Sequence, residues 1–397
     1  MTPAASGSAA RSIVLTSKSG QFGGMEFRML DEARFLVAQG HKVTVAAPHF
    51  PGVAGFVAAL AEIEVPSRQF EPPPFLTNWR LRHLHWLRSR AAGRRALAGL
   101  QPDLAHVFMS WSDQGLEQLW SARQAGAPTV ISVHNAFPAC DFTPWHRRHI
   151  AHAFAGLRGL YAVSRSALAQ FEAIFEAWIP KDAIRTVIYN AVDSERFRPR
   201  PDCLAIRAEL GLDATLPLIG SFGRFDDQKQ PLSLLAILVA VRERVPAARL
   251  LLVGRGPLEA EIRAEAARLG IAEAVTILDF RDDIERLFPA LDVHLLVSRN
   301  EGFGLATAEA MSCGVPVVGT RVPGTEEVIE ASGGGALVPL GDSLAAAEVV
   351  AGLLQAPPEE RSAIGAAGRR SVLQRFSKQA WRERLGAFYE RVLGTQA

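Results

Sequence analysis

The chain has 397 residues, of which 48% are hydrophobic and 21% charged, and its formal net charge is +2. This length favours about two or three globular domains, and so small a net charge indicates no particular class of partner. The longest apolar runs, such as 231–241, fall short of the roughly 20 residues that a membrane-spanning helix needs. Residues 1–12 lack the apolar core of a signal peptide. The three cysteines, Cys140, Cys203 and Cys313, are few and widely spaced, which predicts a cytoplasmic protein without a disulfide framework or a metal site.

Short β-branched runs alternate with longer amphipathic segments along the first half, as is typical of an α/β protein. Residues 12–17 predict a first strand, 19–24 a glycine-rich loop, and 25–40 a helix that ends at Gly40. The later runs are apolar throughout, which indicates parallel strands that are buried on both faces. These predicted strands are 41–48, 104–110, 128–134, 159–164 and 186–190.

A second α/β series follows a break at 198–216, which is rich in proline and charge and contains no predicted strand. The two series predict two Rossmann-like halves joined by a linker. Since open parallel sheets bind ligands at the carboxyl ends of their strands, two facing halves would place a site in the cleft between them. The predicted strands of the second half are 218–223, 248–254, 274–280, 293–298, 315–320 and 335–339.

Two glutamates flank a glycine loop within 298–318. Glu301 is predicted in the loop after a strand, and Glu309 about one turn into the following helix. The backbone of 302–304 can approach a ligand closely, and the helix N-terminus offers free N–H groups. An ionised carboxylate has acceptor oxygens for vicinal hydroxyls, so the segment suits a sugar-bearing ligand better than bare phosphate. The alternative is a plain strand–loop–helix with two solvated glutamates.

Two cations follow another predicted strand, in 221–231. The Arg224 guanidinium can hold phosphate with a bidentate fork, and the Lys229 ammonium adds a point charge. Together they could neutralise a diphosphate without a metal. The alternative is a pair of exposed basic residues in a loop.

Longer motifs extend these observations over nearly the whole chain, with the weakest stretch at about 50–100. The second half contains GRFDDQKQP, LLVGRGPLE and the long segment 280–330. The first half contains SGQFGGMEFRMLDEARFLVAQGHKVTVAAP, SVHNAFP, YAVSRSA and VIYNAVDSERFRP. In this order the motifs resemble the retaining glycosyltransferases of the GT-B fold, and most closely family four, whose members move sugars from nucleotide donors.

The resemblance implies roles for residues of the second half. Glu301 would contact the transferred sugar near the reacting carbon, Glu309 would bind the ribose hydroxyls, and Arg224 and Lys229 would stabilise the departing diphosphate. The other residues that it assigns to the donor site are Gly254 on one wall, Phe280 and Arg281 at the base, the backbone of Gly302, Phe303, Gly304 and Leu305, and Glu327, whose role it leaves open.

In the first half the resemblance assigns Gly23 and Gly24 to the donor phosphates and the acceptor, and His134 to the reacting sugar. An ordinary strand-to-helix turn and a structural histidine are the alternatives. The sequence departs from the family pattern at Arg255, at Gln230 and at 279–283, where DFRDD replaces a glycine-containing turn. The last departure leaves the base of the donor open.

The resemblance implies an acceptor-side domain at 1–198, a donor-binding domain at 199–378, and a helix at 379–397 that crosses back to the first domain. The expected reaction is transfer from a UDP- or GDP-sugar with retention, by same-face attack, without a metal or another cofactor. A sugar-nucleotide epimerase of the same fold and a non-enzymatic nucleotide-sugar-binding protein remain alternatives. A pyridoxal-dependent glycan phosphorylase is disfavoured, because no convincing cofactor lysine motif is present.

The segment 79–95 contains six arginines, together with Trp79 and Trp86, and has no acidic residue. Arginine beside tryptophan and leucine is the composition of a helix that lies in a membrane interface. This composition fits a glycan or lipid-linked acceptor of the cell envelope and a peripheral position on the inner face of the membrane. A solvated basic helix face is the alternative. Nucleic acid is not expected as a partner, because no binding module for it is recognised.

Overall fold

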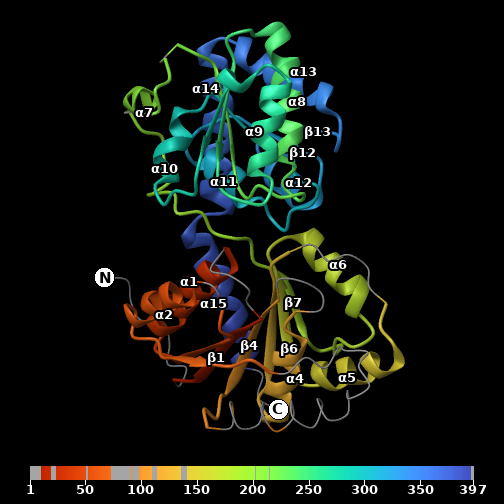
Figure 1. Ribbon diagram of the computed structural model, residues 1–397. Coiled ribbons are helices and arrows are strands. Elements are labelled where there is room, and N and C mark those ends of the chain that lie inside the picture. Colours follow the sequence, from red (N-terminus) through yellow and green to blue (C-terminus); the bar gives the residue numbers. More distant parts are fainter. Residues whose placement is uncertain are drawn as a thin grey trace. The chain divides into compact units, whose positions relative to one another are not determined.

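The computed structural model describes residues 10–18, 24–50, 52–72, 91, 97, 99–109, 114–135, 141–201, 203–213 and 215–394. The chain divides into two compact units. Unit 1 is Met1–Ile188 together with Arg384–Ala397, and unit 2 is Tyr189–Glu383 (Figure 1). The sequence predicts its divisions at 198/199 and 378/379 instead.

Unit 1 is built on a parallel sheet, with seven strands among its described residues, in the order β3-β2-β1-β4-β5-β6-β7. This order reverses between β1 and β4, which is the usual place for a ligand in a doubly wound sheet. The strands are β1 (Ser12–Ser17), β2 (Lys42–Ala47), β3 (Ser67–Gln69), β4 (Leu104–Met109), β5 (Thr129–Val133), β6 (Leu157–Ala162) and β7 (Ile184–Val187).

Helices lie on both faces of this sheet (Figure 1). They are α1 (Gly24–Ala38), α2 (Val53–Ala61), α4 (Leu116–Gln124), α5 (Pro144–Phe154), α6 (Arg165–Phe175) and the C-terminal part of α15 (Lys378–Gly394). Side chains of α4, α5 and α6 pack with those of β4, β5 and β6 in a core that includes Phe154, Phe171 and Phe175. Burial of each such side chain stabilises the fold by about 1.5–3 kcal/mol.

Unit 2 repeats the same plan. Its described residues form a parallel sheet in the order β10-β9-β8-β11-β12-β13, which reverses between β8 and β11. The strands are β8 (Leu218–Phe222), β9 (Arg249–Val253), β10 (Val275–Leu278), β11 (Val293–Leu296), β12 (Val317–Thr320) and β13 (Gly335–Val338). The helices are α7 (Cys203–Glu209), α8 (Pro231–Arg244), α9 (Glu259–Arg268), α10 (Ile284–Leu287), α11 (Leu305–Ser312), α12 (Pro323–Ile329), α13 (Ser343–Gln355) and α14 (Pro358–Arg375), with single 3-10 turns η1 (Ala272–Ala274) and η2 (Phe288–Ala290).

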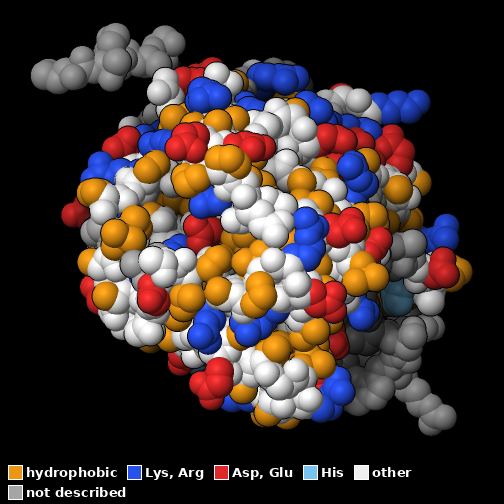
Figure 2. All heavy atoms as spheres, turned by 90° about the horizontal axis from the view of Figure 1, so that it is seen from above, with side chains coloured by type: hydrophobic (Ala, Val, Ile, Leu, Met, Phe, Trp, Pro, Cys, Tyr) orange, Lys and Arg blue, Asp and Glu red, His pale blue; other side chains and the backbone are white. Residues whose placement is uncertain are grey.

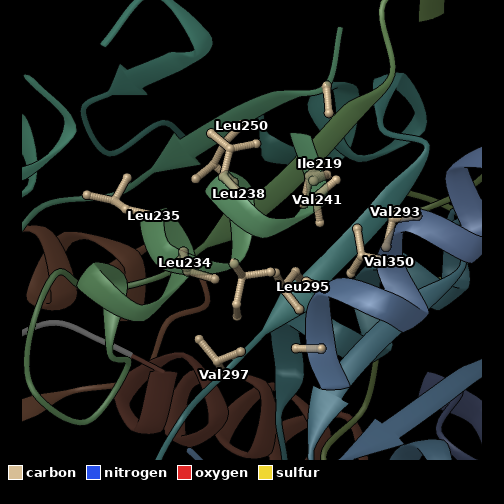
Figure 3. Packing of buried hydrophobic residues seen from close by; sticks show 14 of the residues in the cluster. Ile219, Leu234, Leu235, Leu238, Val241, Leu250, Val293, Leu295, Val297 and Val350 are labelled. Atoms are coloured by element: carbon tan, nitrogen blue, oxygen red, sulfur yellow. The ribbon is translucent and has the colours of Figure 1, made fainter. Parts of the chain in front are cut away.

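The core of unit 2 lies between the sheet and the helices α8, α9 and α13. Figure 3 shows leucines of α8 directed at β-branched and leucine side chains of the strands, with Val350 of α13 beside them. Leu235, Leu238 and Val241 repeat at the helical spacing and are buried, which explains why the apolar run 231–241 forms one helix of a globular core.

Most predicted elements occur where the sequence places them, with ends shifted by a few residues. The predicted helix stop at Gly40 is confirmed: Gly40 has φ 85°, and the His41 N–H donates to the Leu36 carbonyl, which closes the helix. The strand predicted at 186–190 corresponds to β7 (Ile184–Val187), which begins two residues earlier in the chain. No helix of the described residues is long and apolar enough to cross a membrane. Acidic and basic side chains are interspersed on the face shown in Figure 2.

Candidate active site

An ion pair joins the ends of two neighbouring strands in unit 2. Lys229 lies in the turn after β8, and Glu301 lies in the loop after β11. Lys229 Nζ is 2.5 Å from Glu301 Oε1, and the two side chains are 21% and 8% exposed. Because β8 and β11 are adjacent where the strand order reverses, their carboxyl ends bring these two charges together. The two groups that the sequence assigns to different parts of the donor are thus paired with each other.

Gln228 connects the same two loops and was missed from the sequence. Its Nε2 donates to the Asn300 carbonyl at 3.1 Å, and its own carbonyl accepts from the Arg299 N–H at 2.8 Å. Its Oε1 accepts from Arg224 Nη2 at 2.9 Å, while Arg224 Nη1 lies 2.8 Å from Asp226. The half-exposed guanidinium of Arg224 is therefore oriented before any ligand binds. The sequence signal that could have indicated this role is the position of Gln228 between Arg224 and Lys229.

Gln230, one of the departures from the family pattern, adds another connection. It precedes α8 with φ 49°, a left-handed conformation that glycine adopts at lower cost. In the amide orientation that satisfies both side-chain atoms, Gln230 donates to the Val297 carbonyl at 3.1 Å and accepts from Arg299 Nε at 3.0 Å. These two hydrogen bonds offset the backbone cost and hold the turn after β8 against the segment after β11.

The glycine loop after β11 is shaped by close packing. A Cβ on Gly324, at the start of α12, would lie 2.4 Å from the Glu301 carbonyl oxygen, so this position requires glycine. The Phe303 side chain is buried and packs edge-on against Phe376, with ring centroids 5.0 Å apart. Gly304 has φ 83° and caps α11, and the first N–H groups of this helix, beginning at Leu305, have no partner within it. The buried Gly302 completes the loop. This geometry suits an anion at the start of α11.

Glu309 lies just over one turn into α11, as the sequence predicts, and is partly exposed. The Glu309 carboxylate also acts on Cys313, which follows the last residue of the helix. Burial raises the pKa of the Cys313 thiol well above its ordinary value, and the negative charge of Glu309 raises this pKa further. Cys313 is therefore protonated and inert at neutral pH. The predicted contact of Glu309 with the ribose hydroxyls stays a prediction.

The glycine at 254 is explained by backbone packing. Gly254 follows β9 with φ 153°, and a Cβ there would lie 1.8 Å from the Gly223 carbonyl oxygen. A Cβ on Gly256 would lie 2.3 Å from the Phe225 carbonyl oxygen. The loops after β8 and β9 are thus in contact along their backbones. The predicted contact of Gly254 with the donor stays a prediction.

The segment after β10 carries an exposed aromatic ring. Phe280 is 55% exposed, and the guanidinium of Arg255 lies 5.1 Å from its ring centroid. Arg255 Nε is also 3.2 Å from Asp279 Oδ1. An exposed ring stacked on a cation offers a flat surface for a second planar group.

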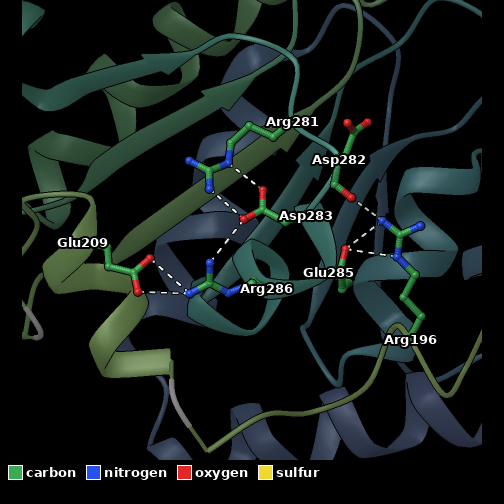
Figure 4. Close-up of polar contacts among 7 residues, drawn as sticks. All are labelled: Arg196, Glu209, Arg281, Asp282, Asp283, Glu285 and Arg286. Carbon is green, nitrogen blue, oxygen red and sulfur yellow. Dashed lines mark hydrogen bonds and ion pairs between the residues drawn. The ribbon is translucent and has the colours of Figure 1, made fainter.

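Arg281, the next residue, is held by its own loop (Figure 4). Its guanidinium forms a fork with Asp283, with both contacts at 2.7 Å. This fork lowers the pKa of Asp283 to about 2, although burial opposes the shift. Asp283 also contacts Arg286, whose guanidinium reaches Glu209 of α7 at 3.0 Å. The Arg281 side chain is thereby engaged within its own loop. The predicted contact of this residue with the base of the donor stays a prediction.

Arg196 fixes the other side of this segment (Figure 4). It precedes α7 and donates to Glu285 of α10 at 2.9 Å and to the carbonyl of Asp282. The DFRDD segment is therefore anchored from both sides by charged contacts, in place of the glycine-containing turn of the family pattern.

Glu327, on α12, is engaged within unit 2. Its Oε2 accepts a hydrogen bond from the Tyr189 hydroxyl at 3.0 Å, and its carbonyl accepts one from Arg375 at 2.7 Å. These contacts give Glu327 a structural role. A contact with the donor stays a prediction.

In unit 1, His134 directly follows β5. Its Nε2 lies 2.9 Å from the Ser132 hydroxyl, and its ring is stacked on Phe108 with centroids 5.3 Å apart. Burial lowers the pKa of His134 to about 3, so the ring is neutral at physiological pH.

Gly24 is the first residue of α1, and no heavy atom lies within 4 Å of the place where its Cβ would be. Gly23 lies outside the described residues.

Two further predictions concern charge and metals. The basic segment 79–95 lies outside the described residues except for Ala91. Within the described part of the chain, no three His, Cys, Asp or Glu side chains are grouped so that they could hold a metal ion. The positive charges that the sequence assigns to a diphosphate are those of Arg224 and Lys229.

Comparison with known proteins gives a family match for each half of the chain. Glycosyltransferase family 4 matches residues 22–196, and the glycosyl transferases of group 1 match residues 216–356. A GDP-mannose-dependent alpha-(1-6)-phosphatidylinositol monomannoside mannosyltransferase of Mycolicibacterium smegmatis is 30% identical over 66% of this chain and 69% of its own length. An N-acetyl-alpha-D-glucosaminyl L-malate synthase of Bacillus anthracis is 33% identical over 50% of this chain and 51% of its own length, so the chain spans about half the length of this relative.

The fold is shared with solved structures. HepE of Anabaena, solved in complex with UDP, superposes with a TM-score of 0.78 at 22% identity, over 96% of this chain and 99% of that one. At this identity the likeness concerns the fold, which is the GT-B fold that the sequence predicts. Each half of the chain matches one of the two family descriptions, and the two matches follow each other in the order that the motifs indicate. The chain therefore belongs to glycosyltransferase family 4, the group 1 glycosyl transferases.

Proposed function

We propose that this protein transfers a hexose from a nucleotide-sugar donor to a glycan or lipid-linked acceptor with retention of anomeric configuration. The observation that carries the proposal is the Lys229–Glu301 pair at the strand-order reversal of unit 2. The oriented Arg224 and the N-terminus of α11 complete this constellation, which combines groups for phosphate with groups for hydroxyls.

Each part of the donor has a proposed partner. Arg224, Lys229 and the N–H groups that open α11 bind the diphosphate. Glu309 binds the ribose hydroxyls, and Glu301 binds the sugar near the reacting carbon. The Phe280–Arg281 segment receives the base, with the backbone around Gly254 on the neighbouring wall.

The chemistry follows from where charge develops. Cleavage of the bond between C1 and the phosphate oxygen builds positive charge on the sugar and negative charge on the diphosphate. Arg224 and Lys229 stabilise the diphosphate. The acceptor hydroxyl forms the new bond to C1 on the face that the diphosphate leaves, and its proton passes to the departing phosphate oxygen. His134 contacts the sugar as a neutral ring.

The diphosphate also changes the environment of Glu301. When Lys229 binds phosphate, it shares its three N–H donors between the phosphate and the carboxylate. The carboxylate is then free to accept a sugar hydroxyl while it stays close to the positive charge that develops at C1. The pair thus links recognition of the diphosphate with placement of the sugar.

The acceptor class is proposed from two observations. The mycolicibacterial relative is named as a phosphatidylinositol monomannoside mannosyltransferase, and the segment 79–95 combines arginine with tryptophan. We propose a lipid-linked acceptor of the cell envelope, reached from the inner face of the membrane by a cytoplasmic protein. Co-sedimentation with vesicles that contain anionic lipid, but not with neutral vesicles, is the expected result. Equal sedimentation with both would contradict this assignment.

The test of the enzymatic proposal is slow hydrolysis across a panel of UDP-, GDP- and ADP-sugars with a chelator present. We expect one donor to release its nucleoside diphosphate, and the rate to be unchanged by the chelator. No release from any donor would leave the chain without support for transfer. Mass spectrometry then tests same-face attack, because a glycosyl ester trapped on Glu301 would show a double displacement instead.

A further inference from the structure

The chain enters unit 2 once and leaves it once. Residues 189–193 form the entry segment, and residues 375–378, where α14 ends and α15 begins, form the exit segment. The two segments lie side by side, because the Val192 N–H donates to the Phe376 carbonyl at 2.8 Å and Val192 pairs with Ser377 in a parallel β-bridge. A displacement of one segment therefore requires the other to move as well.

A buried aromatic cluster joins both segments to the glycine loop of the candidate active site. Phe303 of the loop is 3% exposed, Tyr189 of the entry segment 9% and Phe376 of the exit segment 1%. The Phe376 ring lies edge-on to both other rings, with centroids 5.0 Å from Phe303 and 5.2 Å from Tyr189. The centroids of Tyr189 and Phe303 are 6.1 Å apart. All three pairs lie within the range of favourable aromatic contact, so one side chain of the loop contacts both segments.

The two segments also hold α12, the helix that packs against the glycine loop. Gly324, near the start of α12, lies against the backbone of 301–303. Farther along the helix, the Glu327 carboxylate accepts from the Tyr189 hydroxyl at 3.0 Å, and the Glu327 carbonyl accepts from Arg375 at 2.7 Å. Each segment thus contacts the loop through a ring and the supporting helix through a hydrogen bond.

The glycine loop depends on these contacts for its position. Gly302 and Gly304 carry no side chain that could anchor them, and glycine is free to adopt many backbone conformations. Phe303 is the residue between them whose side chain packs into the interior. The place of the first N–H groups of α11 therefore depends on where the Phe303 ring is held.

We infer that Tyr189 and Phe376 are positioning residues for the glycine loop, and that through them an anion bound at the start of α11 restrains the entry and exit segments. The part that concerns the anion rests on the proposed function, whereas the positioning of the loop concerns the protein alone. Coupling between two sites is reciprocal. Loss of either ring should therefore loosen the loop, and an ordered loop should restrain the segments.

Hydrogen exchange of the full-length protein without ligand, measured by NMR, tests the positioning of the loop. The reporters are the Thr307 and Ala308 amides, which donate to the Gly304 carbonyl at 3.1 and 3.2 Å. Tyr189→Leu removes the aromatic ring, and we expect both amides to exchange about 10-fold faster, because local opening becomes easier. Tyr189→Phe keeps the ring, and both amides should exchange as in wild type.

Two further variants supply a match and a control. Phe376→Leu removes the second ring and should speed the same amides. Val350→Ala removes volume from the fully buried core around α13, which does not contain the three rings. It should lower the free energy of unfolding without changing the exchange of these amides. Equal exchange in Tyr189→Leu and wild type, or an equal increase in Val350→Ala, would overturn the inference.

Inorganic pyrophosphate is the probe for the effect of an anion, since it carries the diphosphate that nucleotide-sugar donors share. In wild type we expect it to slow exchange of the α11 amides and, about 5-fold, of the Val192 N–H in the entry segment. In Tyr189→Leu the α11 amides should still be slowed, but Val192 should not. Equal slowing of Val192 in both proteins would contradict the restraint. If pyrophosphate slows no amide of α11 while the ligand-free comparison holds, the proposed diphosphate site fails and the positioning of the loop stands.

Discussion

The Lys229 ammonium lies 2.5 Å from the Glu301 carboxylate, and the surrounding loops leave that carboxylate only 8% exposed. An ion pair this enclosed costs desolvation energy, which its geometry and its hydrogen bonds must repay. Here Gln228 and Gln230 hold the two loops together by hydrogen bonds to Asn300, Arg299 and Val297. The pair is therefore a fixed part of unit 2.

Removal of one partner should be more harmful than removal of both charges. Lys229→Ala leaves the Glu301 carboxylate enclosed without its cation, and we expect it to lower the free energy of unfolding by about 3 kcal/mol. Lys229→Ala combined with Glu301→Gln should recover most of this loss, because the amide carries no charge. Urea unfolding of Lys229→Ala, Glu301→Gln and the double variant measures the coupling between the two side chains. If the double variant were as unstable as the sum of the single ones, the pair would not be coupled.

The contact between the β8 and β9 loops makes Gly254 intolerant of a side chain. In Gly254→Ala, the new Cβ would meet the Gly223 carbonyl oxygen at 1.8 Å, and the backbone has φ 153°. We expect a loss of about 3 kcal/mol or more in the free energy of unfolding. Gly352→Ala is the control, because this helical glycine has no heavy atom within 4 Å of the added Cβ. The free energy of unfolding of Gly352→Ala should rise by about 0.5–1 kcal/mol.

The Arg281–Asp283 fork should make the stability of unit 2 sensitive to acid. The pKa of Asp283 is lowered from its ordinary value of 3.8 to about 2. Because the folded state depresses this pKa, the stabilisation is fully present above pH 3.8 and is lost as the pH falls through about 2. In denaturant unfolding over this pH range, the free energy of unfolding should fall less steeply for Asp283→Asn than for wild type. Equal slopes would mean that the fork is absent in solution.

A buried histidine should add a second acid-sensitive contribution at higher pH. His294, on β11, is fully buried beside Phe222 and Phe288, and burial lowers its pKa from 6.5 to about 3. The unfolded chain therefore binds the proton first, and stability falls as the pH drops from 6.5 toward 3. His294→Leu should flatten this part of the profile. A profile that keeps its full slope in the variant would contradict the assignment.

Much of the fold could be predicted from sequence, because parallel strands buried on both faces are continuous apolar runs. Strands β1, β8 and β11 begin at the predicted residues. Strand β3 (Ser67–Gln69) was missed because it is a short, exposed edge strand of polar residues, without periodicity. Helix α7 lies inside the predicted break, where proline and charge mask its few apolar positions.

The site was predictable where motif residues follow strands, as for Lys229 and Glu301. The connecting role of Gln228 and the engagement of the Arg281 side chain by Asp283 were not, because both depend on how loops from different strands meet. Nor could the sequence indicate that Glu32 contacts Tyr389, since these residues lie far apart in the chain and meet only through packing of α15 on α1.

The central claim is that unit 2 holds a nucleotide-sugar site around Glu309, and calorimetric titration of UDP, GDP and ADP into the full-length protein tests it most directly. We predict that one nucleotide binds to wild type with chelator present, and that Glu309→Ala weakens its binding at least 10-fold, which corresponds to about 1.4 kcal/mol. Glu348→Ala, an exposed glutamate on α13, should bind as wild type does. Equal binding by the wild type and Glu309→Ala, or binding of no nucleotide at all, would contradict the account.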